Sequence, residues 1–161
     1  MKFNFFLRLV LLIVSASITQ STYAIEKFTA NGPTVKDNVT GLVWARCSVG
    51  QNWDGNICTG EIKKMAYEQA VEYAKNQKGW RLPNKDELES LIDKERKEQQ
   101  KNPTIDMRAF PNTGTDVKEY WSSSLYLDNP YYAWIVDFGY GRVYGYFRYG
   151  DGAVHLVRAN D

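Results

Sequence analysis

The chain has 161 residues, 20 Lys and Arg against 19 Asp and Glu, a formal net charge of +1, and 43% hydrophobic residues. A near-neutral chain lacks the basic field that attracts nucleic acid or an anionic membrane, so we expect no nucleic acid partner. The length and the hydrophobic content suit one domain with one core.

The N-terminal segment has the order of residues typical of a secretory signal peptide. Basic residues precede an apolar run over residues 9–14, and small residues lead up to Ala24. The sequence therefore predicts a signal peptide over residues 1–24 and a single domain over residues 25–161, which would place the protein in the periplasm, at the cell surface or in the medium. A membrane anchor is the alternative, but the apolar run is far shorter than the ~20 residues of a spanning helix.

The two cysteines, Cys47 and Cys58, both lie in the predicted mature chain. In an exported protein an even count favours a disulfide, because thiols do not stay reduced there, and a loop of this length stabilises a fold by roughly 3 kcal/mol. A zinc or redox pair is the alternative, but zinc would need more soft ligands and the single His155 lies far along the chain. We therefore expect a Cys47–Cys58 disulfide, no metal and no cofactor.

The first part of the domain predicts a hairpin followed by a helix. Residues 34–46 read as two short strands around a turn that is rich in Asp, Asn and Gly. Residues 61–77 carry apolar side chains at spacings of three and four, which indicates an amphipathic helix that Gly79 ends.

A second helix is predicted to begin at Asn84. Its side chain can cap the helix, and Glu87 completes a pattern typical of a capping box. Residues 94–101 are polar all round, so this stretch is expected to project into solvent or to fray. Residues 102–119 read as a long loop that apolar side chains pin to the core. These side chains are Ile105, Met107 and Phe110.

The last part predicts strands. Four candidates lie over residues 120–125, 133–138, 143–149 and 153–159, with strong turn signals between them. This spacing builds an antiparallel meander, so we predict an α+β domain of two helices packed on antiparallel β-sheets with a C-terminal meander.

Several short motifs occur in one order over nearly the whole predicted mature chain. They include Thr40-Gly41-Leu42-Val43-Trp44, Trp80-Arg81-Leu82-Pro83, Tyr120-Trp121-Ser122-Ser123-Ser124 and Val157-Arg158. The ordered set resembles the Lcl C-terminal domain family, named for the end of a bacterial collagen-like adhesin. The resemblance implies a C-type-lectin-like fold, and the adhesin is a trimer that binds sulfated glycosaminoglycans through this domain. This chain lacks a Gly-x-y collagen stretch, so the resemblance gives no basis for collagen-driven trimerisation.

Calcium and catalysis are both disfavoured by the residues present. Sugar-binding C-type lectins carry Glu-Pro-Asn or Gln-Pro-Asp and then Trp-Asn-Asp, whereas this chain has Asp128-Asn129-Pro130 and Trp134-Ile135-Val136-Asp137. Formylglycine-generating enzymes, which are distant relatives by this resemblance, use a late reactive cysteine pair that the chain lacks. His155 alternates with apolar residues, which favours a structural role, so we expect a protein that is not an enzyme.

Arg81 is interpreted as scaffold that pairs with a carboxylate and loop carbonyls rather than as a ligand contact.

The unusual feature of the chain is the crowding of tyrosines beside arginines in the last strands. Exposed rings beside Arg suit sugar stacking, sulfate pairing or protein hot spots. We predict an exported adhesion or recognition module that binds a glycan, including sulfated glycosaminoglycan-like ligands, and the alternative is a structural or protein-interaction subunit of an exported assembly. The predicted contacts are Tyr140 and Arg142 at a turn and, on one face of the next strand, Tyr144, Tyr146 and Arg148.

Overall fold

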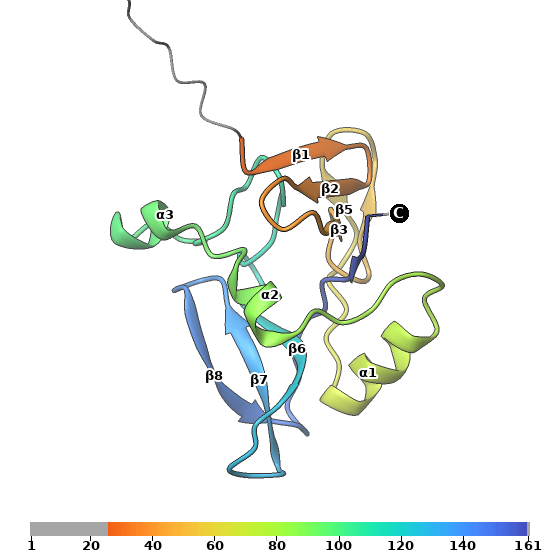
Figure 1. Ribbon diagram of the computed structural model, residues 1–161, viewed down its shortest axis with the longest axis vertical. Helices are drawn as coiled ribbons and strands as arrows, with labels where there is room; N and C mark the ends of the chain where they lie inside the picture. The colour runs from red at the N-terminus through yellow and green to blue at the C-terminus, as the bar shows by residue number, and fades with distance from the viewer. Residues whose placement is uncertain (1–25, 161) are drawn as a thin grey trace, which may run out of the picture.

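The computed structural model describes residues 26–160, which form three antiparallel sheets and three short helices (Figure 1). The mixed α and β content agrees with the expected fold class. The predicted signal peptide over residues 1–24 lies outside the described residues. Within residues 26–160, no helix is long and apolar enough to cross a membrane.

The first sheet has the strand order β1-β2-β3-β9. Its first three strands are β1 (Phe28–Asn31), β2 (Thr34–Asp37) and β3 (Val43–Ala45). The predicted hairpin of β2 and β3 is confirmed, and its turn is built on Asp37. The Oδ1 atom of Asp37 accepts hydrogen bonds from the backbone N–H groups of Val39 and Thr40, at 2.9 and 3.2 Å. These local bonds explain why the turn is evident from the sequence.

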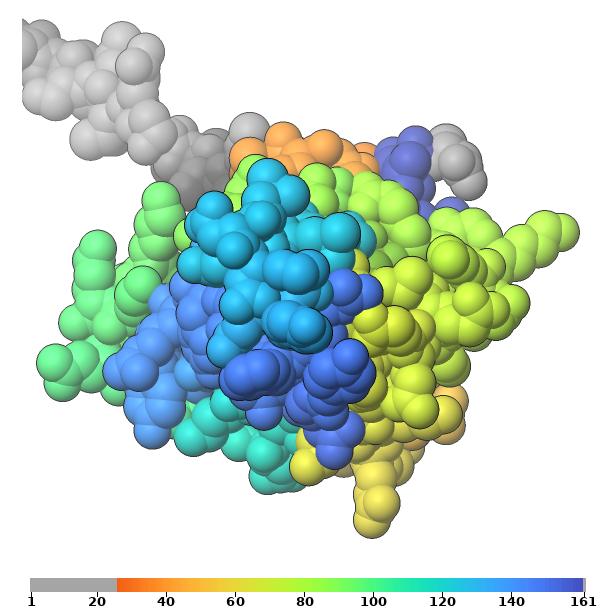
Figure 2. All heavy atoms as spheres, turned by 90° about the horizontal axis from the view of Figure 1, so that it is seen from below, coloured from red at the N-terminus to blue at the C-terminus, as the bar shows by residue number. Residues whose placement is uncertain are grey.

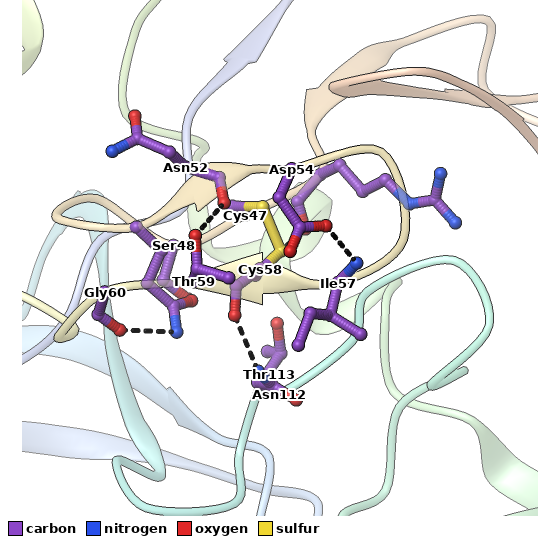
Figure 3. The surroundings of a disulfide bond; sticks show 12 residues. Cys47, Ser48, Asn52, Asp54, Ile57, Cys58, Thr59, Gly60, Asn112 and Thr113 are labelled. Atoms are coloured by element: carbon purple, nitrogen blue, oxygen red, sulfur yellow. Dashed lines mark hydrogen bonds between the residues drawn. A yellow bond between two sulfur atoms is a disulfide. The ribbon is translucent and has the colours of Figure 1, made fainter.

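A small ribbon of β4 (Asn52–Trp53) and β5 (Cys58–Thr59) carries the disulfide. Cys47 and Cys58 are bonded, with Cα atoms 5.5 Å apart, which confirms the predicted pair (Figure 3). The Asn112 side chain donates a hydrogen bond of 2.8 Å to the carbonyl oxygen of Cys58. The disulfide ribbon is therefore tied to the long loop as well as to the chain before it.

Helix α1 (Tyr67–Lys75) is shorter than the predicted helix over residues 61–77. The residues before it are extended, because their backbone groups bond to distant segments. The N–H of Lys63 donates to the carbonyl oxygen of Val49 at 2.8 Å, and Met65 forms a bridge with Gly152. The helical spacing of the apolar residues is real, but tertiary hydrogen bonds decide where the helix begins.

Two more helices follow, so the prediction of two helices was wrong by one. Helix α2 (Lys85–Glu89) begins as predicted, because the Asn84 side chain accepts from the N–H of Glu87 at 2.8 Å. Helix α3 (Lys94–Glu98) forms in the stretch that was expected only to project or fray. Asp93 caps it by accepting from the N–H of Arg96 at 3.0 Å.

The C-terminal meander has three strands, in the order β6-β7-β8. They are β6 (Glu119–Leu125), β7 (Tyr132–Asp137) and β8 (Arg142–Phe147). The predicted fourth strand over residues 153–159 was wrong, since only β9 (Val157–Arg158) is a strand and it pairs with β3 in the other sheet. The chain from Ala153 to Arg158 crosses between the two sheets and bonds to both, and the N–H of Ala153 donates to the carbonyl oxygen of Glu119 in β6 at 2.8 Å.

The meander separates two clusters of buried side chains. On one face Val136 packs with Leu88 and Leu91 around α2, and on the other Trp121 and Ile135 pack with residues of α1. The long loop is pinned as predicted, with Ile105 and Phe110 fully buried and Met107 partly buried. Each face of the meander is therefore covered in part, and its turns, its β8 edge and the strand residues beyond α2 stay accessible to other molecules.

A buried polar group lies inside the larger cluster. His155 is fully buried, and its Nε2 lies 2.9 Å from the hydroxyl of Thr113. The Tyr120 ring stacks on the imidazole with centroids 5.1 Å apart, and its hydroxyl lies 2.9 Å from that of Ser48. Burial lowers the pKa of His155 to about 4 and raises the pKa of Tyr120 to about 12. Both groups are therefore neutral near pH 7.

Candidate functional site

The turn between β7 and β8 presents an aromatic ring to solvent. The Oδ1 atom of Asp137 accepts hydrogen bonds from the N–H groups of Gly139 and Tyr140, at 2.7 and 3.3 Å. Gly141 follows with φ of +63°, a conformation that glycine adopts without strain. The fixed backbone holds the Tyr140 side chain outward, 53% exposed.

Two cations lie against the Tyr140 ring. The Lys118 ammonium is 4.8 Å from the ring centroid, and the Arg142 guanidinium carbon is 5.1 Å from it. Cations at this range are attracted by the negative face of the ring. The ring therefore keeps two long side chains gathered at one place on the surface.

A third cation comes from α3, and glycines make room for the lysines. A Cβ at Gly139 would lie 2.5 Å from Cδ of Lys118, and a Cβ at Gly141 would lie 2.9 Å from Cδ of Lys97. The aliphatic parts of both lysine side chains therefore pack against the glycine backbone of this turn. Figure 1 shows α3 beside this end of the meander. We call Lys97, Lys118, Tyr140 and Arg142 the cationic turn.

The three cations of the cationic turn form no ion pair with an acidic side chain of residues 26–160. The ion pairs found within residues 26–160 join other side chains, so none of them neutralises Lys97, Lys118 or Arg142. Two unpaired positive charges beside one ring, with the Lys97 stem on the neighbouring Gly141, attract an anion with several oxygens.

The other predicted contacts lie away from the cationic turn. Tyr144 and Tyr146 are half-buried on the face of the meander that packs towards α1, and the Tyr146 ring is 5.7 Å from that of buried Trp121. Arg148 lies beyond the far end of β8, roughly 20 Å along the strand from Arg142. It forms an ion pair with Glu68 and donates to the carbonyl oxygen of Pro130 at 2.8 Å. The structure thus brings Tyr140 and Arg142 together and gives the other three residues contacts within the fold.

The match to a known family is extensive. The family model described as the Lcl C-terminal domain matches residues 33–158. This chain belongs to the Lcl C-terminal domain family. The resemblance inferred from the ordered motifs is confirmed, and membership suggests an extracellular, adhesin-like module. No curated protein matches the chain.

The motif arginine of this Lcl C-terminal domain is engaged inside the fold. Arg81 binds Glu87 through two hydrogen bonds of 2.7 Å and donates to the carbonyl oxygen of Leu82 at 3.1 Å. The bidentate pair raises the pKa of Arg81 and lowers the pKa of Glu87. This is the arrangement expected for a scaffold residue, although the guanidinium is half-exposed rather than buried.

Ser122, Ser124 and His155, which carry hydroxyl and imidazole groups, make structural contacts. Ser122 donates to the carbonyl oxygen of Trp134 at 2.9 Å, and the Ser124 hydroxyl accepts from the N–H of Lys85 at 3.0 Å. His155 is enclosed in the core. Among residues 26–160, no group of three or more His, Cys, Asp or Glu side chains is placed to hold a metal ion.

Two groups of surface residues are not evident from the sequence. Lys97 and Lys118 are remote from Tyr140 in the chain, and the only local signal was the pair of glycines that flank Tyr140. The second group is a row of rings on the α2 side of the meander, which alternation along β7 could have indicated. We call it the outer aromatic row, and it consists of Tyr126, Tyr132, Trp134 and Phe147.

Proposed function

We propose that this protein is an exported recognition module that binds a sulfated glycan at the cationic turn. The observation that carries the proposal is the convergence of Lys118 and Arg142 on the exposed Tyr140 ring. Within residues 26–160 no acidic side chain forms an ion pair with either cation. A sulfate accepts charge-assisted hydrogen bonds from both cations, and the ring offers a face to the sugar that carries the sulfate.

Export and a C-type-lectin-like fold belong to the same proposal. The Cys47–Cys58 disulfide supports export, because such bonds persist in oxidising compartments. The short helices and antiparallel sheets are compatible with a lectin-like arrangement. We also propose a role in binding rather than in catalysis, supported by the enclosure of His155 in the core.

The test compares binding of the mature protein to heparin, to dextran sulfate and to uncharged dextran as salt is raised. We expect binding to the two sulfated polymers only, with affinity falling steeply with salt. The Lys118→Ala/Arg142→Ala variant loses two exposed charge contacts of about 1 kcal/mol each. Its affinity for the sulfated polymers should therefore be roughly thirtyfold lower than that of the wild type.

The matched control is Lys64→Ala/Lys78→Ala, which removes two exposed lysines elsewhere with the same change in net charge. It should bind almost as the wild type does. Equal losses in both double variants would mean that only net charge matters, and the proposed site would be rejected. Arg148→Ala tests whether the ligand binds at the other end of β8. If this variant lost binding without losing stability, the site would lie at the Arg148 end and not at the cationic turn.

A second candidate function, a protein-interaction subunit of an exported assembly, is favoured by one observation. Leu127, Tyr131 and Tyr149 are 92%, 60% and 79% exposed at the end of the meander where β6 turns into β7. Figure 2 looks onto this end and shows the hairpin beside the chain that follows β8. An apolar surface of this kind is typical of protein contacts. If the domain is such a subunit, it should bind no sulfated polymer. Leu127→Ser should then reduce assembly with the partner chain.

A further inference from the structure

The outer aromatic row lies on one open face of the meander. The register pairs Tyr132 with Phe147, and Trp134 with Gly145, so these side chains share the face on which α2 packs. Successive ring centroids are 4.8 Å apart from Trp134 to Tyr126, 6.1 Å from Tyr126 to Tyr132, and 4.4 Å from Tyr132 to Phe147. Helix α2 ends the row at Lys85, whose ammonium lies 5.9 Å from the Trp134 ring. The four rings thus form a continuous strip beyond α2.

The strip is held in place before any ligand arrives. A Cβ at Gly145 would lie 2.7 Å from Cδ2 and 2.9 Å from Cε2 of Tyr126, so this ring lies directly on the backbone of β8. Trp134 flanks the Tyr126 ring on the neighbouring strand. Fixed rings lose little conformational freedom on binding, which favours affinity.

The polar edges of the strip are available. No hydrogen bond within residues 26–160 uses the hydroxyl of Tyr126, the hydroxyl of Tyr132 or the Nε1 atom of Trp134. None of the three atoms is enclosed in the core, so water reaches them. A fully apolar partner would leave these groups unpaired, at a cost in free energy. A ligand that suits the strip has apolar faces and hydroxyl edges.

The strip is also close to neutral. Its neighbouring cation, Lys85, is paired with Asp86 and Glu89, in contrast to the unpaired cations of the cationic turn. A sulfate or carboxylate would therefore find no free positive charge here. A pyranose ring has an apolar C–H face and a rim of hydroxyls, which matches both the rings and their polar edges.

We propose that the outer aromatic row is a second binding site, which stacks a neutral, unsulfated sugar chain along Trp134, Tyr126, Tyr132 and Phe147. The site uses none of the residues of the cationic turn. Its success or failure is therefore independent of the function proposed above.

The test measures binding of the mature protein to cellohexaose, xylohexaose, chitohexaose and mannohexaose by calorimetry, at low and at high salt. We expect at least one of them to bind with an affinity that salt does not change. Loss of a stacking contact in Trp134→Ala should weaken that binding roughly tenfold. Tyr132→Phe keeps the ring and removes only the hydroxyl, so it should cause a smaller loss.

The control Lys118→Ala/Arg142→Ala should bind the neutral sugar as the wild type does, although it binds heparin roughly thirtyfold more weakly. Phe147→Ala, at a half-exposed position, replaces Trp134→Ala if that variant does not fold. The proposal is overturned if none of the four sugars binds, or if both ring variants bind as the wild type does. It is also overturned if the wild type is a dimer that Phe147→Ala converts to a monomer, because the strip would then be a protein interface.

Discussion

The buried imidazole of His155 predicts a specific loss of stability in mild acid. Its pKa is lowered by burial from an ordinary value of 6.5 to about 4 in the folded protein. Between these values the unfolded chain binds a proton that the folded chain does not, so the free energy of unfolding falls as pH falls. A difference of this size corresponds to roughly 3 kcal/mol, lost across the window from pH 6.5 to 4 and unchanged below it.

The assay is denaturant unfolding of residues 25–161 at a series of pH values, with His155→Gln as the reference. Glutamine retains a polar atom near Thr113 but packs differently from imidazole, so we expect the variant to be less stable at every pH. Because glutamine does not titrate, its free energy of unfolding should not fall between pH 6.5 and 5. The carboxyl groups of Glu87 and Asp106 have lowered pKa values, and their contribution is lost only as pH falls through the acid range. The upper part of the window therefore reports on His155. Equal slopes for wild type and variant between pH 6.5 and 5 would refute the reasoning, and the only histidine of the chain gives an unambiguous NMR titration as a second check.

Three further predictions concern stability. Replacing both Cys47 and Cys58 by Ser should lower the free energy of unfolding by roughly 3 kcal/mol, measured in urea, and an unchanged midpoint would contradict the loop-entropy argument. Asn84→Ala should cost about 1 kcal/mol through loss of the cap of α2, whereas Asn84→Asp should cost much less, and equal costs would show that the cap contributes little. Melting curves in calcium and in chelator should overlay, and a rise of several degrees with calcium would reveal a metal site.

The features that the sequence predicted well depend on residues close together in the chain. The Asp37 turn and the Asn84 cap with Glu87 are each completed within a few residues, so their residue types were sufficient evidence. The disulfide was predictable because only one pair of cysteines exists.

The features that it missed depend on distant contacts. The start of α1 is decided by the bridge from Met65 to Gly152, and β9 leaves the meander because its partner β3 lies more than a hundred residues earlier. The cationic turn has the same origin, since only the folded chain brings Lys118 to Tyr140 and Lys97 to Gly141. Helical or alternating patterns report which face of an element is buried, but not what covers it.

The crossing segment from Ala153 to Arg158 has a consequence for folding. It bonds to β3 and to β6, and its residues Val154 and Val157 lie in different core clusters. This segment follows strands β1 to β8 in the chain, so both core clusters stay incomplete until residues 153–158 are in place. We therefore expect the two halves of the domain to fold together rather than one after the other, and cleavage of the chain before Ala153 to leave both halves sensitive to protease.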